Sequence, residues 1–306
     1  MNHIHISDSQ VEESTDLKSL TEELLSAFKD LYAGEAATTI RVRATMSQAA
    51  ASSMSALYPR RNVGGGKLYV YSPRGRSFIV ALFNLDGELL ATFDGEALTA
   101  ERTAAATGIA IRRMSSPDAR IGAILGTGRQ AIWQIKAMNQ EMKLEVLRVA
   151  GRNMQKVREV VDWCLENSIN AVASDFSSAV EDADVIVTVT GTYEPLFDGE
   201  TLKEGALVCG VGSTTALRRE LDAKTIQRAS LVVTDSVEGS LIEAGDLIQA
   251  AAEGFFDFAN LVSIEELVCK NDLVIPSNGL KLFESQGIAL EDVVGAWEIM
   301  RRLELL

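Results

Sequence analysis

The feature that most constrains this chain is an unbroken apolar segment that is followed at once by small residues and then by a helical pattern. Residues 121–125 read IGAIL, and residues 126–138 continue as GTGRQAIWQIKAM. A strand that is apolar on both faces is typical of a parallel sheet covered by helices on both sides. The stretch therefore predicts a strand, a tight turn and a helix of an α/β domain.

The small residues of this turn have the spacing of a dinucleotide-binding loop. Gly126 would permit the turn, Gly128 would let a pyrophosphate approach the backbone, and Ala131 would let helix and strand pack closely. A bare turn could hold the same residues, but the strand before it and the helix and strand after it favour a nucleotide, whose phosphates would meet the free N–H groups of the helix. The expected cofactor contacts in this loop are Gly126, Thr127, Gly128, Arg129 and Gln130.

The rest of the chain shows two different sequence patterns, one on each side of residue 118. After residue 118, apolar segments such as 146–151, 183–190, 206–212 and 230–235 alternate with helical ones, which predicts a doubly wound parallel sheet. Before residue 118, the pattern predicts a mostly antiparallel sheet with flanking helices. The strands are one over 38–46, one that a glycine-rich segment leads into at Lys67, and a hairpin turning at 86–87; the helices cover 14–34 and 97–115. The helix over 287–304 is expected to return to the first domain. We thus expect a domain of residues 1–118 with 288–306, and a dinucleotide-binding domain of residues 119–287.

Composition excludes several classes of function. The net charge of −14 repels nucleic acid, and no apolar run is long enough for a membrane span. The three cysteines are far apart and in no CxxC spacing, which predicts reduced thiols in a cytoplasmic protein. His3 and His5 are the only histidines, and with no further ligand cluster we expect surface positions on a strand and no metal site. Acid–base chemistry would then fall to Lys, Asp, Glu, a hydroxyl or water.

The end of the second strand of the nucleotide domain indicates which cofactor binds. An NAD site usually has a carboxylate there for the ribose hydroxyls, whereas this chain reads Ala150-Gly151-Arg152-Asn153. A guanidinium favours a 2′-phosphate, with which it can pair bidentately. We therefore expect NADPH to be preferred, with NADH possible, and contacts from Gly151, Arg152 and Asn153. Alternatively, Arg152 is a solvated residue at the start of a helix.

Five segments together resemble the ornithine cyclodeaminase/μ-crystallin family. They are LTAERTAA (98–105), GTGRQA (126–131), ADVIVTVT (183–190), GVGSTTALRRELD (210–222) and LFESQGIALED (282–292). The resemblance implies a Rossmann domain, an α/β substrate domain that forms a homodimer, and an active site in the cleft. Thr188, Thr190, Gly212 and Gly287 lie in these segments and are expected to contact the cofactor.

The same resemblance assigns substrate residues. Lys67, with Pro73 in the family's spacing, would contact the substrate carboxylate near the reacting C–N bond. Arg102 would be a second carboxylate partner, also beside the cofactor, and Thr103 would lie over the cofactor phosphates. A strand arginine would complete the clamp, and both Arg41 and Arg43 fit, with Arg41 preferred. An ordinary solvated strand face is the alternative for these two arginines.

One position departs from the cyclodeaminases of the family. They carry an aspartate six residues before the Glu of the E-L-D triplet, and here Thr214 stands six residues before Glu220. A hydroxyl is a poor base for an ammonium group at neutral pH, which weakens the case for ornithine cyclisation. Thr214, or a water that it holds, would orient the substrate nitrogen, and Lys67 or water would supply a proton.

We therefore expect an NAD(P)H-dependent reductase of a small α-imino acid, of ketimine or Δ1-pyrroline-2-carboxylate type. Two alternatives remain. One is an ornithine cyclodeaminase, a lyase that uses bound NAD catalytically to form proline and ammonia. The other is a non-catalytic protein that binds NADPH or another ligand, as some μ-crystallins do.

Overall fold

The computed structural model describes residues 4–306, which divide into two compact units. Unit 1 holds the described residues up to Ala106 together with Gly287–Leu306, and unit 2 is Thr107–Gln286. The sequence suggested a division after residue 118, beyond the end of helix α3 (Gly95–Met114). In the structure the division falls inside this helix. The reason is that Arg102 forms ion pairs within unit 1, whereas Arg112 pairs with Glu141 of unit 2.

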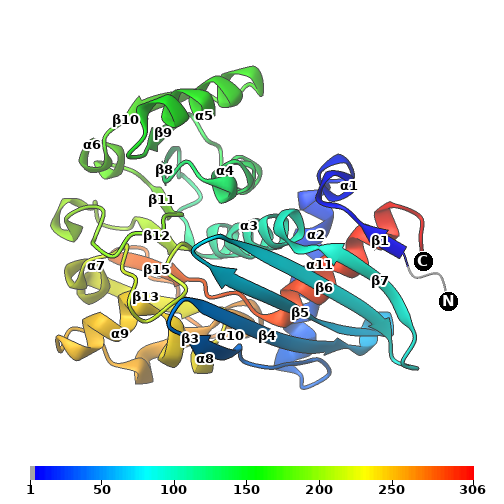
Figure 1. The fold of residues 1–306 in the computed structure, drawn as a ribbon. Helices are drawn as coiled ribbons and strands as arrows, with labels where there is room; N and C mark the ends of the chain where they lie inside the picture. The colour runs from blue at the N-terminus through cyan, green and yellow to red at the C-terminus, as the bar shows by residue number, and fades with distance from the viewer. Residues whose placement is uncertain (1–3) are drawn as a thin grey trace. The chain divides into compact units, whose positions relative to one another are not determined.

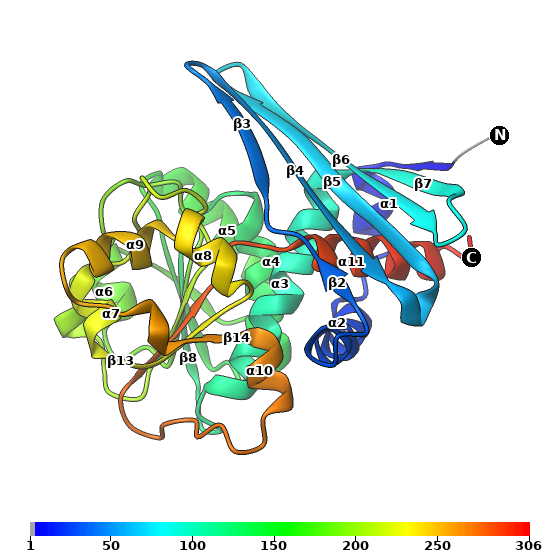
Figure 2. The ribbon, with the colours of Figure 1, turned by 90° about the horizontal axis from the view of Figure 1, so that it is seen from below.

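Unit 1 is a seven-stranded sheet with helices packed on one face. The strand order is β1-β7-β6-β5-β4-β2 with β3 also on β4, and only the β1–β7 pair is parallel. Helices α2 and α11 pack against each other, and α11 lies along β4 and β5, so the final helix does return to the first part of the chain (Figures 1 and 2). The elements are β1 Ile4–Ile6, α1 Asp8–Glu13, α2 Leu17–Tyr32, β2 Ala37–Thr38, β3 Val42–Met46, β4 Ala49–Tyr58, β5 Val63–Ser72, β6 Gly75–Asn84, β7 Leu89–Asp94 and α11 Ala289–Arg302.

The glycines before Lys67 are part of strand β5 and not an approach to it. A Cβ on Gly65 would lie 2.1 Å from the carbonyl oxygen of Ala81 on β6, so the residue allows close contact between neighbouring strands. Strand β4 was missed in the sequence because it consists largely of alanine and serine, which have no strong strand preference. These two strands form the centre of the sheet and carry Met54 opposite Lys67.

Unit 2 is an eight-stranded parallel sheet, as expected from the apolar segments. Its strand order is β10-β9-β8-β11-β12-β15-β13-β14, in which the first five strands have the order of a dinucleotide-binding fold. Strand β15 was not predicted and inserts between β12 and β13. The elements are β8 Ile121–Leu125, α4 Arg129–Glu141, β9 Val146–Ala150, α5 Met154–Glu166, β10 Ala171–Ser174, α6 Phe176–Val180, β11 Val185–Thr188, β12 Leu207–Gly210, α7 Ala223–Arg228, β13 Ala229–Thr234, α8 Val237–Glu243, α9 Gly245–Ala252, β14 Leu261–Ser263, α10 Ile264–Cys269 and β15 Leu280–Glu284.

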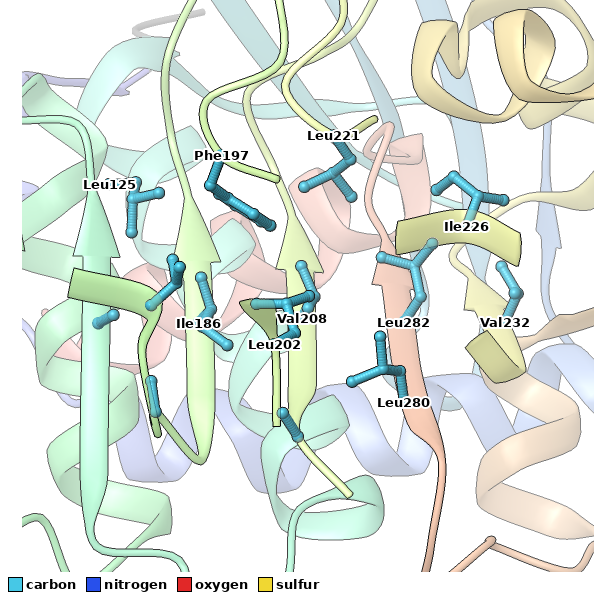
Figure 3. Packing of buried hydrophobic residues seen from close by; sticks show 14 of the residues in the cluster. Leu125, Ile186, Phe197, Leu202, Val208, Leu221, Ile226, Val232, Leu280 and Leu282 are labelled. Carbon is cyan, nitrogen blue, oxygen red and sulfur yellow. The ribbon is translucent and has the colours of Figure 1, made fainter. Parts of the chain in front are cut away.

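Aliphatic side chains hold this sheet together. Ile186, Val208 and Leu282 project from three successive strands into one buried cluster, and Leu202 and Phe197 cover them from the connecting segments (Figure 3). The order of strands places the loop after β8 next to the loop after β11. In open α/β sheets, ligands bind where the strand order reverses in this way, at the carboxyl ends of the strands.

Among the described residues, no helix combines the length and apolarity that a membrane crossing requires. The same residues contain no group of three or more side chains placed to hold a metal ion. His3 lies outside the described residues, and His5 on β1 pairs with Asp94. The cysteines Cys164, Cys209 and Cys269 form no disulfide.

Candidate active site

Lys67 is buried in the middle of the unit 1 sheet. Only 3% of its surface is exposed, its Nζ donates to Thr99 Oγ1 at 2.5 Å and to Asp292 Oδ1 at 3.4 Å, and the Phe78 ring lies 5.1 Å away. Burial lowers the pKa of Lys67 to about 7, against the attraction of Asp292, and the charges of Arg102 and Arg41 lower it further. A lysine in this state can hold or release a proton at neutral pH.

Arg102 lies beside Lys67 and is joined to the start of α11. Its Nε donates to Asp292 Oδ1 at 3.0 Å, and its Nη1 donates to Glu291 Oε2 at 2.5 Å. Gly287, expected among the cofactor residues, lies in unit 1 against this guanidinium. A Cβ there would be 2.7 Å from both Nη atoms, and the φ of +77° is one that a side chain would disfavour. Gly287 therefore makes room for Arg102.

The structure separates the two strand arginines. Arg41 donates from Nη2 to the carbonyl of Gly287 at 3.2 Å and is one of the charges acting on Lys67, whereas Arg43 donates to Ser52 Oγ. Val42 between them and Ile40 before them are exposed, so both arginines lie on the more buried face of the segment. Arg41 thus lies with Lys67 and Arg102, while Arg43 is linked to strand β4 through Ser52.

These side chains form what we call the cation cluster: Arg41, Lys67 and Arg102 with the buried carboxylates Glu291 and Asp292. Thr99 supports it from α3, and Thr103, one turn later, donates its hydroxyl to the Thr99 carbonyl at 2.7 Å. Asp292, Glu291 and Thr99 were not identified from the sequence. The signal available was the LFESQGIALED segment, which was used only for the family resemblance.

In unit 2, the glycines of the turn after β8 have two different functions. A Cβ on Gly126, whose φ is +121°, would lie 2.8 Å from the Val189 carbonyl oxygen, and one on Gly151 would lie 3.1 Å from Thr127. The neighbouring backbone therefore requires a glycine at 126, whereas a side chain at 151 would need only small shifts of Thr127 and Val157. A Cβ on Gly128 would meet nothing within 4 Å, although this residue begins α4. The fold itself does not need a glycine there, whereas a ligand that rests on the backbone does.

The start of α4 differs from most helix starts in unit 2. Side chains cap the first N–H groups of α5, α6, α7, α8 and α10, but none caps α4. Such a start attracts a phosphate, because the helix dipole adds to the free donors. Asn153 is the cap of α5, and its Oδ1 accepts from the N–H groups of Gln155 and Lys156. Arg152, just before it, is exposed and forms no ion pair with any described residue.

A buried carboxylate organises the loops after β11 and β12. Oε1 of Glu220 accepts from the Thr190 N–H at 2.5 Å and hydroxyl at 2.7 Å, and Oε2 accepts from the Thr188 hydroxyl and the Gly212 N–H, both at 2.8 Å. The sequence motif had used Glu220 only as the reference position from which Thr214 was counted, and no role was predicted for Glu220 itself. Three residues expected to touch the cofactor therefore donate these hydrogen bonds to Glu220 and so fix their own loops. They are Thr188, Thr190 and Gly212.

Glu220 is itself fixed by Asp246, whose Oδ1 accepts from the N–H groups of Glu220 and Leu221 at 2.7 and 2.6 Å. Burial and the charge of Asp246 raise the pKa of Glu220 to about 7, although hydrogen bonds from Thr190 and Thr188 oppose the rise. Burial also raises the pKa of nearby Glu284. Thr214 is half-buried and makes no side-chain hydrogen bond to described residues.

Residues 1–305 match the model of the ornithine cyclodeaminase/mu-crystallin family. The chain belongs to this family. It is 34% identical to the ketimine reductase mu-crystallin of Rattus norvegicus over 212 residues, which are 69% of this chain and 64% of that protein, slightly less than two thirds of its length. Family membership and the α/β fold with its doubly wound sheet are thus confirmed.

Two solved structures are also similar. The probable ornithine cyclodeaminase from Bordetella pertussis Tohama I superposes with a TM-score of 0.92 at 30% identity, covering 99% of this chain and 97% of that one. The Δ1-pyrroline-2-carboxylate reductase of Thermococcus litoralis, solved with NADH and L-proline, superposes with a TM-score of 0.92 at 26% identity, covering 98% of each chain. The fold is thus shared by proteins bearing both kinds of name.

The Glu220 network predicts a change in stability with pH. The folded chain keeps the Glu220 proton up to about pH 7, whereas an unfolded glutamate releases it near 4.5, so stability falls as pH rises through this range. Glu220→Gln should flatten this fall, because the titrating group is removed. It should cost about 1–3 kcal/mol at pH 7.5, where the carboxylate accepts from four donors and an amide N–H would face one of them. Urea unfolding between pH 5 and 7.5 measures both effects, with exposed Glu238→Gln as control. An unchanged profile in Glu220→Gln would show that Glu220 is ionised throughout.

Proposed function

We propose that the protein is an NAD(P)H-dependent reductase of a small α-imino acid, of ketimine or Δ1-pyrroline-2-carboxylate type. The observation that carries this proposal is the cation cluster, in which three cations gather around two buried carboxylates and would attract the acid group of a substrate. Charge-assisted hydrogen bonds in a buried site can hold a carboxylate and fix the α-carbon beside it. The reductase names of the rat and Thermococcus relatives support the same reaction.

Each residue has a proposed role. Arg41 and Arg102 bind the substrate carboxylate with Lys67, while Arg43 supports the strand through Ser52. When bound, the reduced nicotinamide supplies the hydride that the imine carbon accepts. Lys67 or water gives the proton to the nitrogen, and Thr214 orients that nitrogen.

Ornithine cyclisation remains the second candidate, because of the similarity to the probable cyclodeaminase from Bordetella. That reaction needs a base for an ammonium group, and the hydroxyl of Thr214 does not supply one. A protein that only binds ligands would not need a buried lysine whose pKa is about 7. Both points favour the reductase.

Net consumption of the cofactor distinguishes these candidates. With Δ1-pyrroline-2-carboxylate and NADPH, absorbance at 340 nm should fall steadily, and Lys67→Ala should lower kcat at least tenfold while cofactor affinity stays the same, because Lys67 lies in unit 1. Ammonia release from ornithine without net cofactor change would establish the cyclodeaminase instead. Absence of both reactions, with NADPH still bound, would favour a binding protein.

The residues of unit 2 fit a dinucleotide. The open space at Gly128 and the uncapped start of α4 suit a pyrophosphate, which the N–H groups of residues 128–130 would hold. Arg152 would bind the 2′-phosphate of NADPH, with Gly151 and the Nδ2 of Asn153 beside it. The loops held by Glu220 would receive the nicotinamide. In this assignment unit 2 binds the cofactor, and unit 1 binds substrate and forms the dimer.

Two variants separate the parts of the cofactor site. Arg152→Ala should weaken NADPH binding about 10- to 100-fold, since a charged hydrogen-bonded pair is lost, and leave NADH binding unchanged. Gly128→Ala should weaken both without lowering the melting temperature, because its methyl group meets no protein atom. Fluorescence titration of each cofactor measures these affinities. Equal affinities of the wild type for NADPH and NADH would contradict the role of Arg152.

One face of the unit 1 sheet supports the homodimer. On strands β3 to β6, the register places one set of uncharged side chains together on this face: Val42, Ala44, Ala51, Ser53, Ser55, Leu57, Gly64, Gly66, Leu68, Val70, Ser77, Ile79, Ala81 and Phe83. On β7, Asp94 lies beside Ile79 at the edge of this set. Val42 is 64% exposed and Leu68 52%, although both are apolar. A continuous apolar face of this kind marks an interface. The three cysteines form no disulfide, which fits the proposed cytoplasmic location, where thiols stay reduced.

The dimer is tested by placing a charge on this face. Light scattering after gel filtration should give the mass of two chains for the wild type and of one chain for Leu68→Lys, because a buried lysine would lack a partner. Val172→Lys, at a similarly exposed apolar position on β10 of unit 2, is the matched control and should remain dimeric. A monomeric wild type would disprove the dimer, as would a dimeric Leu68→Lys at micromolar concentration.

A further inference from the structure

Building on the proposed reductase, we infer that Asp292 and Thr99 are positioning residues that hold Lys67 as an ammonium group with one N–H directed to the substrate, which makes Lys67 the proton donor. This assigns the proton transfer that the proposed function left between Lys67 and water. It also gives Asp292 and Thr99 roles in the reaction that the sequence did not suggest.

The argument begins with the hydrogen bonds of Lys67. A lysine ammonium has three N–H donors. The Thr99 hydroxyl donates its own hydrogen to the Gly95 carbonyl, so its oxygen accepts one N–H of Lys67. Asp292 Oδ1 accepts a second N–H. No other described residue accepts from Lys67 within hydrogen-bond distance, which leaves the third N–H for a ligand.

Asp292 is placed to set the charge of Lys67 as well as its position. It is fully buried, and the same Oδ1 accepts from Arg102 Nε, so one carboxylate oxygen lies between two cations. Its other oxygen, Oδ2, accepts no hydrogen bond from the described residues. A buried carboxylate favours the charged form of a neighbouring amine, whereas Arg102 and Arg41 oppose it. Glu291 belongs to the same cluster, where its Oε2 accepts from Arg102, and the charges that act most strongly on Lys67 are those of Asp292, Arg102 and Arg41.

Substrate binding would complete this arrangement. The substrate carboxylate would neutralise Arg41 and Arg102, and the ammonium form of Lys67 would then be favoured. The C=N π bond accepts a hydride at carbon from the reduced nicotinamide, and the nitrogen takes the proton from Nζ. The products are the secondary amine and the oxidised cofactor, and neutral Lys67 recovers its proton from solvent.

The pH dependence of the rate tests this inference. Since kcat/KM reports groups of the free enzyme, its alkaline limb should lie near pH 7 in the wild type and at higher pH for kcat. Asp292→Asn should move the alkaline limb of kcat/KM down by about 1 pH unit, because an opposite charge is removed. Glu291→Gln, the matched control on the same helix turn, should raise KM through Arg102 without moving the limb. The substrate's own titration is common to all variants.

Thr99→Val provides a variant of nearly the same shape, in case Asp292→Asn does not fold. It should move the limb in the same direction, because a hydrogen bond to the charged form is lost. Equal limbs in wild type, Asp292→Asn and Thr99→Val would overturn the inference, as would an equal shift in Glu291→Gln.

A binding measurement separates this inference from the proposed reaction. Pyrrole-2-carboxylate has a carboxylate but no basic nitrogen, so calorimetric titration at pH 7.5 in buffers of different ionisation enthalpy reports protons taken up by the protein. We expect uptake in the wild type and Glu291→Gln, and reduced uptake in Asp292→Asn. Uptake without any imine reduction would contradict the proposed function alone. Reduction of imines without uptake would contradict the role of Lys67 alone.

Discussion

The shared hydrogen bonds of Asp292 are the interaction on which the structure of unit 1 depends. An isolated charge in a protein interior is strongly unfavourable, and removing one member of a buried pair commonly costs about 3–5 kcal/mol. Lys67 and Arg102 are each 3% exposed, and both donate to one oxygen of Asp292. The start of α11 therefore has to pack where it does, across the middle of the sheet, since that position supplies the carboxylates.

The same physics explains why the cluster is suited to a ligand. Three cations and two buried carboxylates lie together in it, an arrangement that suits an acid group from outside the chain. Unit 2 follows the same principle, with backbone N–H groups in place of cationic side chains. Glu220 takes up the donors of the loops after β11 and β12, while the donors at the start of α4 are left without a capping side chain. In each unit, the positively charged side chains or the positively polarised N–H groups indicate that the expected ligand is an anion.

The sequence predicted the parts of the fold that have strong periodic patterns. IGAIL and the glycine turn after it gave the nucleotide-binding strand and helix, and the final amphipathic helix was correctly assigned to the first unit. Strand β4 was missed because alanine and serine carry little hydrophobic signal, and β15 because a short strand inserted from a distant part of the chain has no local marker. The unit boundary inside α3 could not be predicted either, since one continuous helix serves both units.

For the candidate site too, the sequence predicted the residues that lie in recognisable motifs and missed those without a local signal. Lys67, Arg102 and Gly128 were identified through motifs, and the structure places them in settings that fit a ligand. The supporting carboxylates Asp292, Glu291 and Glu220 were missed as members of the site, because their partners lie far away in the sequence. The three-dimensional arrangement, and not any local pattern, separates Arg41 from Arg43.

The most direct measurement of the central claim follows the hydride itself. NADPH that carries deuterium at C4 of the nicotinamide, on one face and then on the other, is incubated with the protein and a cyclic α-imino acid, and the amino acid product is analysed by mass spectrometry. We predict that one of the two labelled cofactors gives a product heavier by one mass unit, with deuterium on the α-carbon. A product without label from both cofactors would contradict the account, because the carbon would then have received its hydrogen from another source.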